Sequence, residues 1–94
     1  SERGVEGADL VVEVRSARDE SYANLDFYAT MGVREALVLH PKDRRFELFR
    51  NIDGRMAPVS PGHDGAVLCE VLDIRLSAVN EKIRITWSDG SVDV

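Results

Sequence analysis

Apolar residues follow one another almost without a break in two short segments of the first half of the chain. These are "LVVEV" at residues 10–14 and "EALVLH" at residues 35–40. Near-continuous Val and Leu are typical of strands that are covered on both faces, and we expect this of the first segment. Glu13 interrupts that segment. An unpaired carboxylate is costly in such a strand, so the charge of Glu13 needs compensation.

Alternation along the first strand sorts its side chains onto two faces. Asp9, Val11, Glu13 and Arg15 point to one side, and the apolar residues between them point to the other. One face therefore carries the charge. Two explanations for Glu13 are open at this point: it faces a cleft and holds a divalent ion, or it forms an ion pair with Arg15.

The segment between the two strands, residues 16–31, has the signals of a helix of about four turns. It starts with a capping-box-like pattern, and Gly32 follows it as a stop signal. Leu25, Tyr28 and Ala29 recur at helical spacing and predict an inward stripe. A strand, a helix and a strand with so little connecting chain predict a right-handed parallel crossover.

The pattern changes to antiparallel ribbons after residue 40. The expected strands are "FELFR", "RMAPV", "CEVLDIRL" and "KIRITW". Turn-forming segments separate them, and the closing "WSDG" is a hairpin signal. The sequence therefore predicts one α/β domain over residues 1–94, with a mixed β-sheet, one crossover helix and added antiparallel hairpins.

Composition narrows the class of protein. The 94 residues include 17 acidic and 12 basic side chains, a formal net charge of -5, which argues against a whole surface adapted to nucleic acid. Cys69 is the single cysteine, so an internal disulfide is excluded, and its apolar neighbours predict a core thiol in a cytoplasmic protein. No segment has the roughly 18 consecutive apolar residues of a membrane span. Because the chain starts on Ser1, we expect a processed, tagged or truncated product.

Glu13 and Arg15 are the strongest candidates for chemistry. A carboxylate that binds a divalent cation, beside a cationic side chain that steadies developing negative charge, suits hydrolysis of a phosphodiester. An ordinary ion pair on one face of the strand is the more common meaning of the same pattern. The pattern alone leaves both interpretations open.

The order of the elements is more specific than the pair. "DLVVEVRSA", a helix with "NLDFYATMGV", and "EALVLHPKDRRFELFR" follow one another. This order resembles the second half of a bacterial family of restriction-endonuclease-like proteins, the Uma-two family of the PD-(D/E)XK nuclease superfamily. The later "CEVLDIRLSAVNEKIRITWSDG" looks like the closing strands of that family.

The resemblance implies a role for each polar residue of the first strand. Glu13 would be the acidic member of the (D/E)XK motif and would bind Mg²⁺. Arg15 stands where the superfamily usually has lysine, and Asn24 stands where relatives supply a lysine from the helix. The second metal-binding Asp normally lies on a preceding strand, and Asp9 is its partial substitute as a metal ligand here.

The implied function is therefore Mg²⁺-dependent cleavage of DNA. We expect little or no activity from this chain alone, because the upstream carboxylate and the lysine are missing. The alternative is a non-enzymatic interaction module on a nuclease-like scaffold. Exposed apolar surface on the first strand would then let an open sheet edge pair, most simply in a homodimer.

Other polar residues are weaker candidates. Arg45, Arg50 and Arg55 would form a basic edge for a DNA backbone, although arginines on hairpins are usually solvated. His63 and the aspartate after it lie in the glycine-flanked loop "SPGHDG", where a plain turn is the simpler interpretation. Trp87 is expected to pack rather than to stack on a base.

Overall fold

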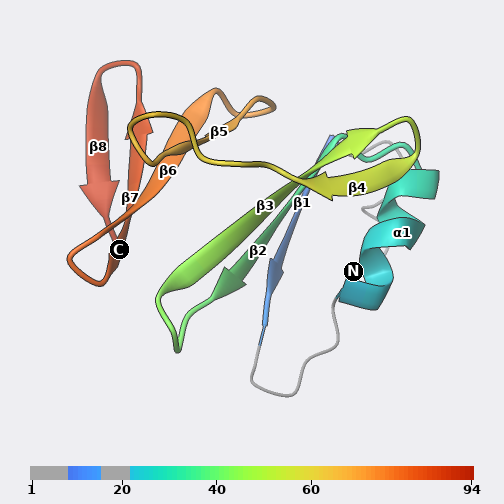
Figure 1. The fold of residues 1–94 in the computed structure, drawn as a ribbon, viewed down its shortest axis with the longest axis horizontal. Coiled ribbons are helices and arrows are strands. Elements are labelled where there is room, and N and C mark those ends of the chain that lie inside the picture. The colour runs from blue at the N-terminus through green and yellow to red at the C-terminus, as the bar shows by residue number, and fades with distance from the viewer. Residues whose placement is uncertain (1–8, 16–21) are drawn as a thin grey trace.

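The computed structural model of the protein describes residues 9–15 and 22–94. These described residues form one helix and two sheets, which are arranged as Figure 1 shows. The elements are β1 (Leu10–Val14), α1 (Tyr22–Thr30), β2 (Glu35–His40), β3 (Arg45–Ile52), β4 (Arg55–Pro58), β5 (Val67–Cys69), β6 (Ile74–Val79), β7 (Lys82–Trp87) and β8 (Gly90–Asp93). Across these described ranges, no helix has the length and apolar character needed to cross a membrane.

The strands form two four-stranded sheets. The first sheet has the order β1-β2-β3-β4, with β1 parallel to β2 and the remaining pairs antiparallel. The second sheet has the order β5-β6-β7-β8 and is antiparallel throughout. The predicted α/β class, with a mixed sheet and a parallel crossover through one helix, is confirmed. The sequence did not predict that the last four strands form a sheet of their own.

Helix α1 covers one face of the first sheet (Figure 1). Leu25 is buried against Ala36, Val38 and Phe49 of strands β2 and β3. Ala29 is buried as well, so the predicted inward stripe is confirmed. The helix ends within one residue of its predicted end, whereas its predicted first part, residues 16–21, lies outside the described residues.

The opposite face of the first sheet packs against the second sheet. The buried residues of this core are Leu37, Leu48, Val67, Cys69, Leu76 and Ile83. Cys69 is fully buried, which confirms the predicted core thiol. The two sheets leave an apolar groove of about 520 Å³ between them, beside Leu39, Ile74 and Ile85.

Two turns follow directly from local chemistry. Asp53 and Gly54 both have positive φ, 55° and 88°, in the two-residue turn that joins β3 to β4. Asp and Gly adopt this conformation readily, and it gives the hairpin the twist of its strands. The turn-forming segment predicted between these two strands is therefore confirmed.

Two predictions about strands are wrong. Strand β1 is not covered on both faces, because Val12 and Val14 are 50% and 63% exposed. Among the described strands, β1 lies at the edge of the first sheet and has β2 as its neighbour. The predicted strand "CEVLDIRL" is interrupted by a turn over residues 70–73, where Asp73 has a φ of 57°. Polar contacts of this turn, described below, replace the pairing of a continuous strand.

Candidate functional site

Glu13 lies on the face of the first sheet that α1 covers. Its Cα pairs with that of Val38, whose side chain is buried beneath the helix. The Tyr28 hydroxyl donates a hydrogen bond to Glu13 Oε2, across the space between helix and strand. The Glu13 side chain is half-buried as a result. The structure thus places Glu13 in a sheltered position, and its hydrogen-bond donor is a tyrosine.

The end of α1 is held firmly, and this fixes Tyr28. Gly32 has a φ of 84°, as a helix-ending glycine does, and the Val33 N–H returns to the Tyr28 carbonyl at 3.1 Å. Asn51 on β3 donates from Nδ2 to the carbonyls of Ala29 and Val33, at 3.1 and 2.9 Å. These contacts satisfy carbonyl groups that a helix end leaves open. They tie the last turn of the helix to the sheet.

Burial and the hydrogen bond to Glu13 keep the Tyr28 hydroxyl protonated, so Tyr28 remains a hydrogen-bond donor. Burial raises the pKa of Tyr28, and the hydrogen bond and the charge of Glu13 raise it further, to about 12. The phenol therefore stays protonated at neutral pH. Among the described residues, Tyr28 supplies the one hydrogen bond to the Glu13 carboxylate, which leaves lone pairs of Oε1 for another ligand.

Asp9 and Arg15, the charged residues on either side of Glu13, have different surroundings. Asp9 is exposed, and its carbonyl accepts hydrogen bonds from the N–H groups of Arg34 and Glu35 at 3.0 and 3.1 Å. Arg15 is half-buried, and its N–H donates to the Leu39 carbonyl at 2.9 Å. At about 3.3 Å per residue, the Cα atoms of Asp9 and Glu13 lie about 13 Å apart. The role of Asp9 as a metal ligand stays a prediction, and Glu13 is the better centre for a site.

The donor set fits a weakly coordinated Mg²⁺ ion better than an all-protein site. Residues 9–15 and 22–94 contain no group of three or more His, Cys, Asp or Glu side chains suited to a metal. Mg²⁺ commonly keeps several waters and takes one or two carboxylates together with phosphate oxygens. Glu13 can supply one such carboxylate. Asn24, one helical turn before Tyr28, is exposed and offers an amide but no cation.

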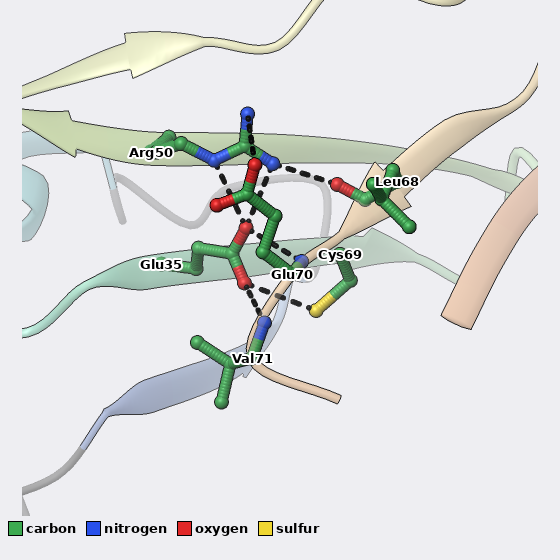
Figure 2. A network of polar contacts seen from close by, with 6 residues as sticks. All are labelled: Glu35, Arg50, Leu68, Cys69, Glu70 and Val71. Atoms are coloured by element: carbon green, nitrogen blue, oxygen red, sulfur yellow. Dashed lines mark hydrogen bonds and ion pairs between the residues drawn. The ribbon is translucent and has the colours of Figure 1, made fainter. Parts of the chain in front are cut away.

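A second carboxylate, which the sequence analysis overlooked, accepts hydrogen bonds on both of its oxygens. Glu35 opens β2, is 1% exposed, and accepts hydrogen bonds from two side chains and from the backbone of the turn after β5 (Figure 2). Arg50 donates to Glu35 Oε2 from Nε and Nη2 at 3.1 and 2.9 Å. The Glu70 N–H donates to the same oxygen at 2.9 Å, and the Val71 N–H and the Cys69 thiol donate to Oε1 at 2.8 and 3.3 Å.

These contacts explain the charge state of Glu35. Burial by itself raises the pKa of the Glu35 carboxyl. The N–H groups of Val71 and Glu70, the guanidinium of Arg50 and the Cys69 thiol outweigh burial and hold the pKa below its ordinary value. Burial and the neighbouring Glu35 raise the pKa of the Cys69 thiol, so Cys69 stays a neutral thiol at neutral pH.

The Glu35 contacts also explain the interrupted strand. The N–H groups of residues 70 and 71 bind the carboxylate, so they are not available to a strand ladder. Arg50 adds a bond from Nη2 to the Leu68 carbonyl at 2.7 Å. Glu35 and Arg50 therefore connect the first sheet to the start of the second. The sequence contained a signal for this ion pair. Glu35 opens an apolar run, and Arg50 is its partner in the hairpin of β2 and β3.

The basic edge, which was the less common of the two alternatives for these arginines, does not include its central member. Arg50 is turned to Glu35 and also lies 3.7 Å from Glu70, so its charge is compensated inside the fold. Arg45 lies near acidic neighbours on its own hairpin, and Arg55 is exposed. The three side chains do not form one basic surface.

The remaining histidines and the tryptophan have structural surroundings. His40 ends β2, is buried, and lies 2.8 Å from Glu47 Oε1 through Nε2. His63 lies exposed in the loop before β5, at the rim of a polar pocket of about 510 Å³. Trp87 is partly exposed and lies over Gly90, where an added Cβ would come within 2.9 Å of the ring. Its packing within the β7–β8 hairpin agrees with the prediction.

Comparison with known proteins gives one result. The model of the family Uma2, described as "Putative restriction endonuclease", matches residues 2–85 of the chain. Searches of curated proteins and of solved structures give no match. The match covers β1, α1 and every strand through β6, and therefore includes both Glu13 and Tyr28.

Proposed function

The chain belongs to the Uma2 family of restriction-endonuclease-like proteins, and from this premise we propose that Glu13 is a metal-binding carboxylate for phosphodiester hydrolysis. The substrate class we propose is DNA, and the ion is Mg²⁺. The observation that carries the proposal is the state of Glu13. It is half-buried, oriented by Tyr28, and retains an oxygen for a ligand.

Each residue of the site has a distinct part in this proposal. Glu13 presents Oε1 to the ion, and Tyr28 holds Oε2 so that the carboxylate does not rotate away. Arg15, two residues further on the same face of β1, faces the region where negative charge develops on the phosphate. A bound Mg²⁺ would polarise the phosphate and activate a water molecule. One carboxylate is a sparse ligand set, so we expect weak metal binding and weak cleavage.

Metal binding without cleavage tests the first step. We expect Mn²⁺, a paramagnetic substitute for Mg²⁺, to broaden the NMR signals of residues 11–15 and Tyr28 first. Glu13→Gln should abolish this broadening and leave the fold intact. Glu81→Gln is the matched control, because it makes the same change at an exposed position in the turn between β6 and β7. Equal broadening in Glu13→Gln and in the unchanged chain would overturn the proposal.

Tyr28→Phe separates orientation from folding. Loss of a group that orients a metal ligand typically weakens metal affinity by about tenfold or more. We expect that weakening for Mn²⁺ in Tyr28→Phe, measured by titration calorimetry. A plasmid-nicking assay with Mg²⁺, repeated with Glu13→Gln, then tests cleavage. Nicking that is unchanged by Glu13→Gln would show that the activity comes from elsewhere.

A non-enzymatic interaction module is the second candidate function. The exposed Val12 and Val14 on an edge strand favour it, because an apolar edge is a ready template for another strand. Absence of any Mn²⁺ effect at Glu13, together with self-association, would support this second function. The cytoplasmic location stays a prediction.

A further inference from the structure

His40 lies on the same face of the first sheet as Glu13. Glu13 pairs with Val38, and His40 comes two positions later on β2, so the His40 side chain shares the face that α1 covers. The Arg15 N–H donates to the Leu39 carbonyl, which places Arg15 beside His40. The Cα atoms of Glu13 and His40 are diagonal neighbours on adjacent strands, about 8 Å apart. Two side chains of this length can contact one water molecule between them.

The Glu47 carboxylate on β3 fixes the orientation of the His40 ring. Glu47 pairs with Val38 from the other side, so it lies on the same face. His40 is 8% exposed, and its Nε2 lies 2.8 Å from Glu47 Oε1. An ionised carboxylate is an acceptor only, so the His40 Nε2–H donates this hydrogen bond. In the neutral ring the lone pair is therefore on Nδ1.

Nδ1 of His40 is available to a ligand. It makes no hydrogen bond to a described residue, and it is not sealed from solvent. The apolar positions before it on this face, Ala36 and Val38, are fully buried. His40 thus marks the point on β2 where the covered face meets water. A carboxylate that holds one ring nitrogen, with the other nitrogen open, is an arrangement that prepares histidine to accept a proton.

The other side chains assigned to this site are poor proton acceptors. Arg15 keeps its charge at every physiological pH, and the Asn24 amide is not basic. Tyr28 keeps its proton, because burial and then Glu13 raise its pKa to about 12. Phosphodiester hydrolysis needs a group that takes the proton of the attacking water, and histidine is the side chain that enzymes use most often for this task. His40 fits that requirement.

We propose that His40 is the general base of the phosphodiester hydrolysis proposed above, and this inference rests on that function. Nδ1 takes a proton from a water molecule while the oxygen of that water forms a bond to phosphorus. The bond from phosphorus to the leaving sugar oxygen breaks, and that oxygen takes a proton from solvent. His40 afterwards returns its proton to solvent. Glu47 is a positioning residue, which acts through His40 and stabilises the imidazolium that forms.

Paramagnetic broadening tests the placement of His40 without any cleavage. Mn²⁺ bound at Glu13 should broaden the NMR signals of the His40 ring, and Glu13→Gln should abolish this effect. His63, exposed in the loop before β5, is the internal control, because its ring signals should be the same in Glu13→Gln and in the unchanged chain. Broadening of residues 11–15 without the His40 ring would overturn the role of His40 and leave the metal site standing. No broadening near Glu13 would overturn both proposals.

The tautomer of the ring tests the part of Glu47. Long-range ¹H–¹⁵N spectra distinguish a protonated ring nitrogen from an unprotonated one. We expect an unprotonated Nδ1 in the neutral His40 ring of the unchanged chain, and a mixture of tautomers in Glu47→Ala, because no carboxylate then selects the Nε2–H form. A protonated Nδ1 in the unchanged chain would overturn the proposal.

His40→Gln separates proton transfer from folding. The glutamine amide can donate to Glu47 in place of Nε2–H, but it has no basic nitrogen. We expect urea unfolding and Mn²⁺ affinity to stay unchanged, and plasmid nicking with Mg²⁺ to fall about 100-fold or more. His63→Gln is the matched control and should nick as the unchanged chain does. Equal nicking by His40→Gln would overturn the role of His40 alone. A chain that binds Mn²⁺ at Glu13 but nicks no DNA would overturn the proposed hydrolysis together with its base.

Discussion

Glu13 and Glu35 lie on neighbouring strands of one sheet, yet their surroundings differ. Glu13 interrupts an apolar run, and Glu35 opens one. Glu35 is 1% exposed and accepts from Arg50, two backbone N–H groups and a thiol. Glu13 is half-buried and accepts from Tyr28. The two side chains also face opposite ways, since Glu13 meets Tyr28 of α1. Glu35 meets the backbone that follows β5 (Figure 2).

The difference separates a structural carboxylate from a candidate ligand. A carboxylate has about four lone-pair sites. The contacts of Glu35 occupy both of its oxygens, so nothing remains for an ion or a substrate. Among the described residues, the Glu13 carboxylate accepts one hydrogen bond, on Oε2, so Oε1 can still bind a ligand. The degree of hydrogen bonding, rather than burial or charge alone, therefore distinguishes the acid that holds the fold from the acid that can bind.

Removal of the charge at each position should give the largest contrast. Glu35→Gln breaks a buried ion pair and leaves Arg50 without its main partner, so we expect the free energy of unfolding to fall by about 3 kcal/mol. Glu13→Gln loses part of one hydrogen bond, and we expect a fall of about 1 kcal/mol or less. Urea unfolding measures both. Similar losses in the two variants would erase the distinction between the two acids.

Acid titration should sharpen the contrast. The folded pKa of Glu35 is lower than its ordinary value of 4.5, so its carboxylate stabilises the fold above that pH. This contribution is lost as the pH falls from 4.5 through the folded pKa. Over that pH range, we expect the free energy of unfolding of the unchanged chain to fall more steeply than that of Glu35→Gln. The difference should be a fraction of the loss expected above for Glu35→Gln at neutral pH. Unfolding midpoints at several pH values measure the slopes, and parallel curves would contradict the assignment.

The smallest effect concerns Tyr28. Its pKa of about 12 depends on burial and then on Glu13, so Glu13→Gln should lower it towards the ordinary 10.0. Because the folded pKa is raised, the contribution of Tyr28 to stability is present below pH 10 and is lost as the pH rises towards 12. Tyrosinate absorbance reports the titration, with Tyr22→Phe as the background that removes the other tyrosine. An unchanged pKa in Glu13→Gln would mean that the contact does not exist in solution.

Elements that depend on local pattern could be predicted from the sequence. Strand β2, strand β7 and the end of α1 agree with apolar spacing and with turn residues, because neighbouring residues determine them. The parallel crossover follows as well, since a short helix between two strands permits little else. The family was also identified from the order of these elements and is confirmed.

Features that depend on distant partners could not be predicted. The break between β5 and β6 occurs because residues 70 and 71 bind the carboxylate of Glu35, which lies 35 and 36 positions earlier in the chain. Tyr28 was assigned to the apolar stripe, and its hydroxyl contact with Glu13 needs the three-dimensional placement of the helix. Hydrophobic periodicity predicts which face of a helix or strand a side chain lies on, but it does not predict which atoms that side chain contacts.

One amide side chain links the site to a remote hairpin. Asn51 donates to the last turn of α1, and its Oδ1 accepts the Gly54 N–H of the β3–β4 turn at 2.8 Å. The geometry of that turn therefore helps to set where the tyrosine stands. A substitution in this solvent-facing turn, at least 40 positions after Glu13 in the sequence, can therefore change the position of its hydrogen-bond donor.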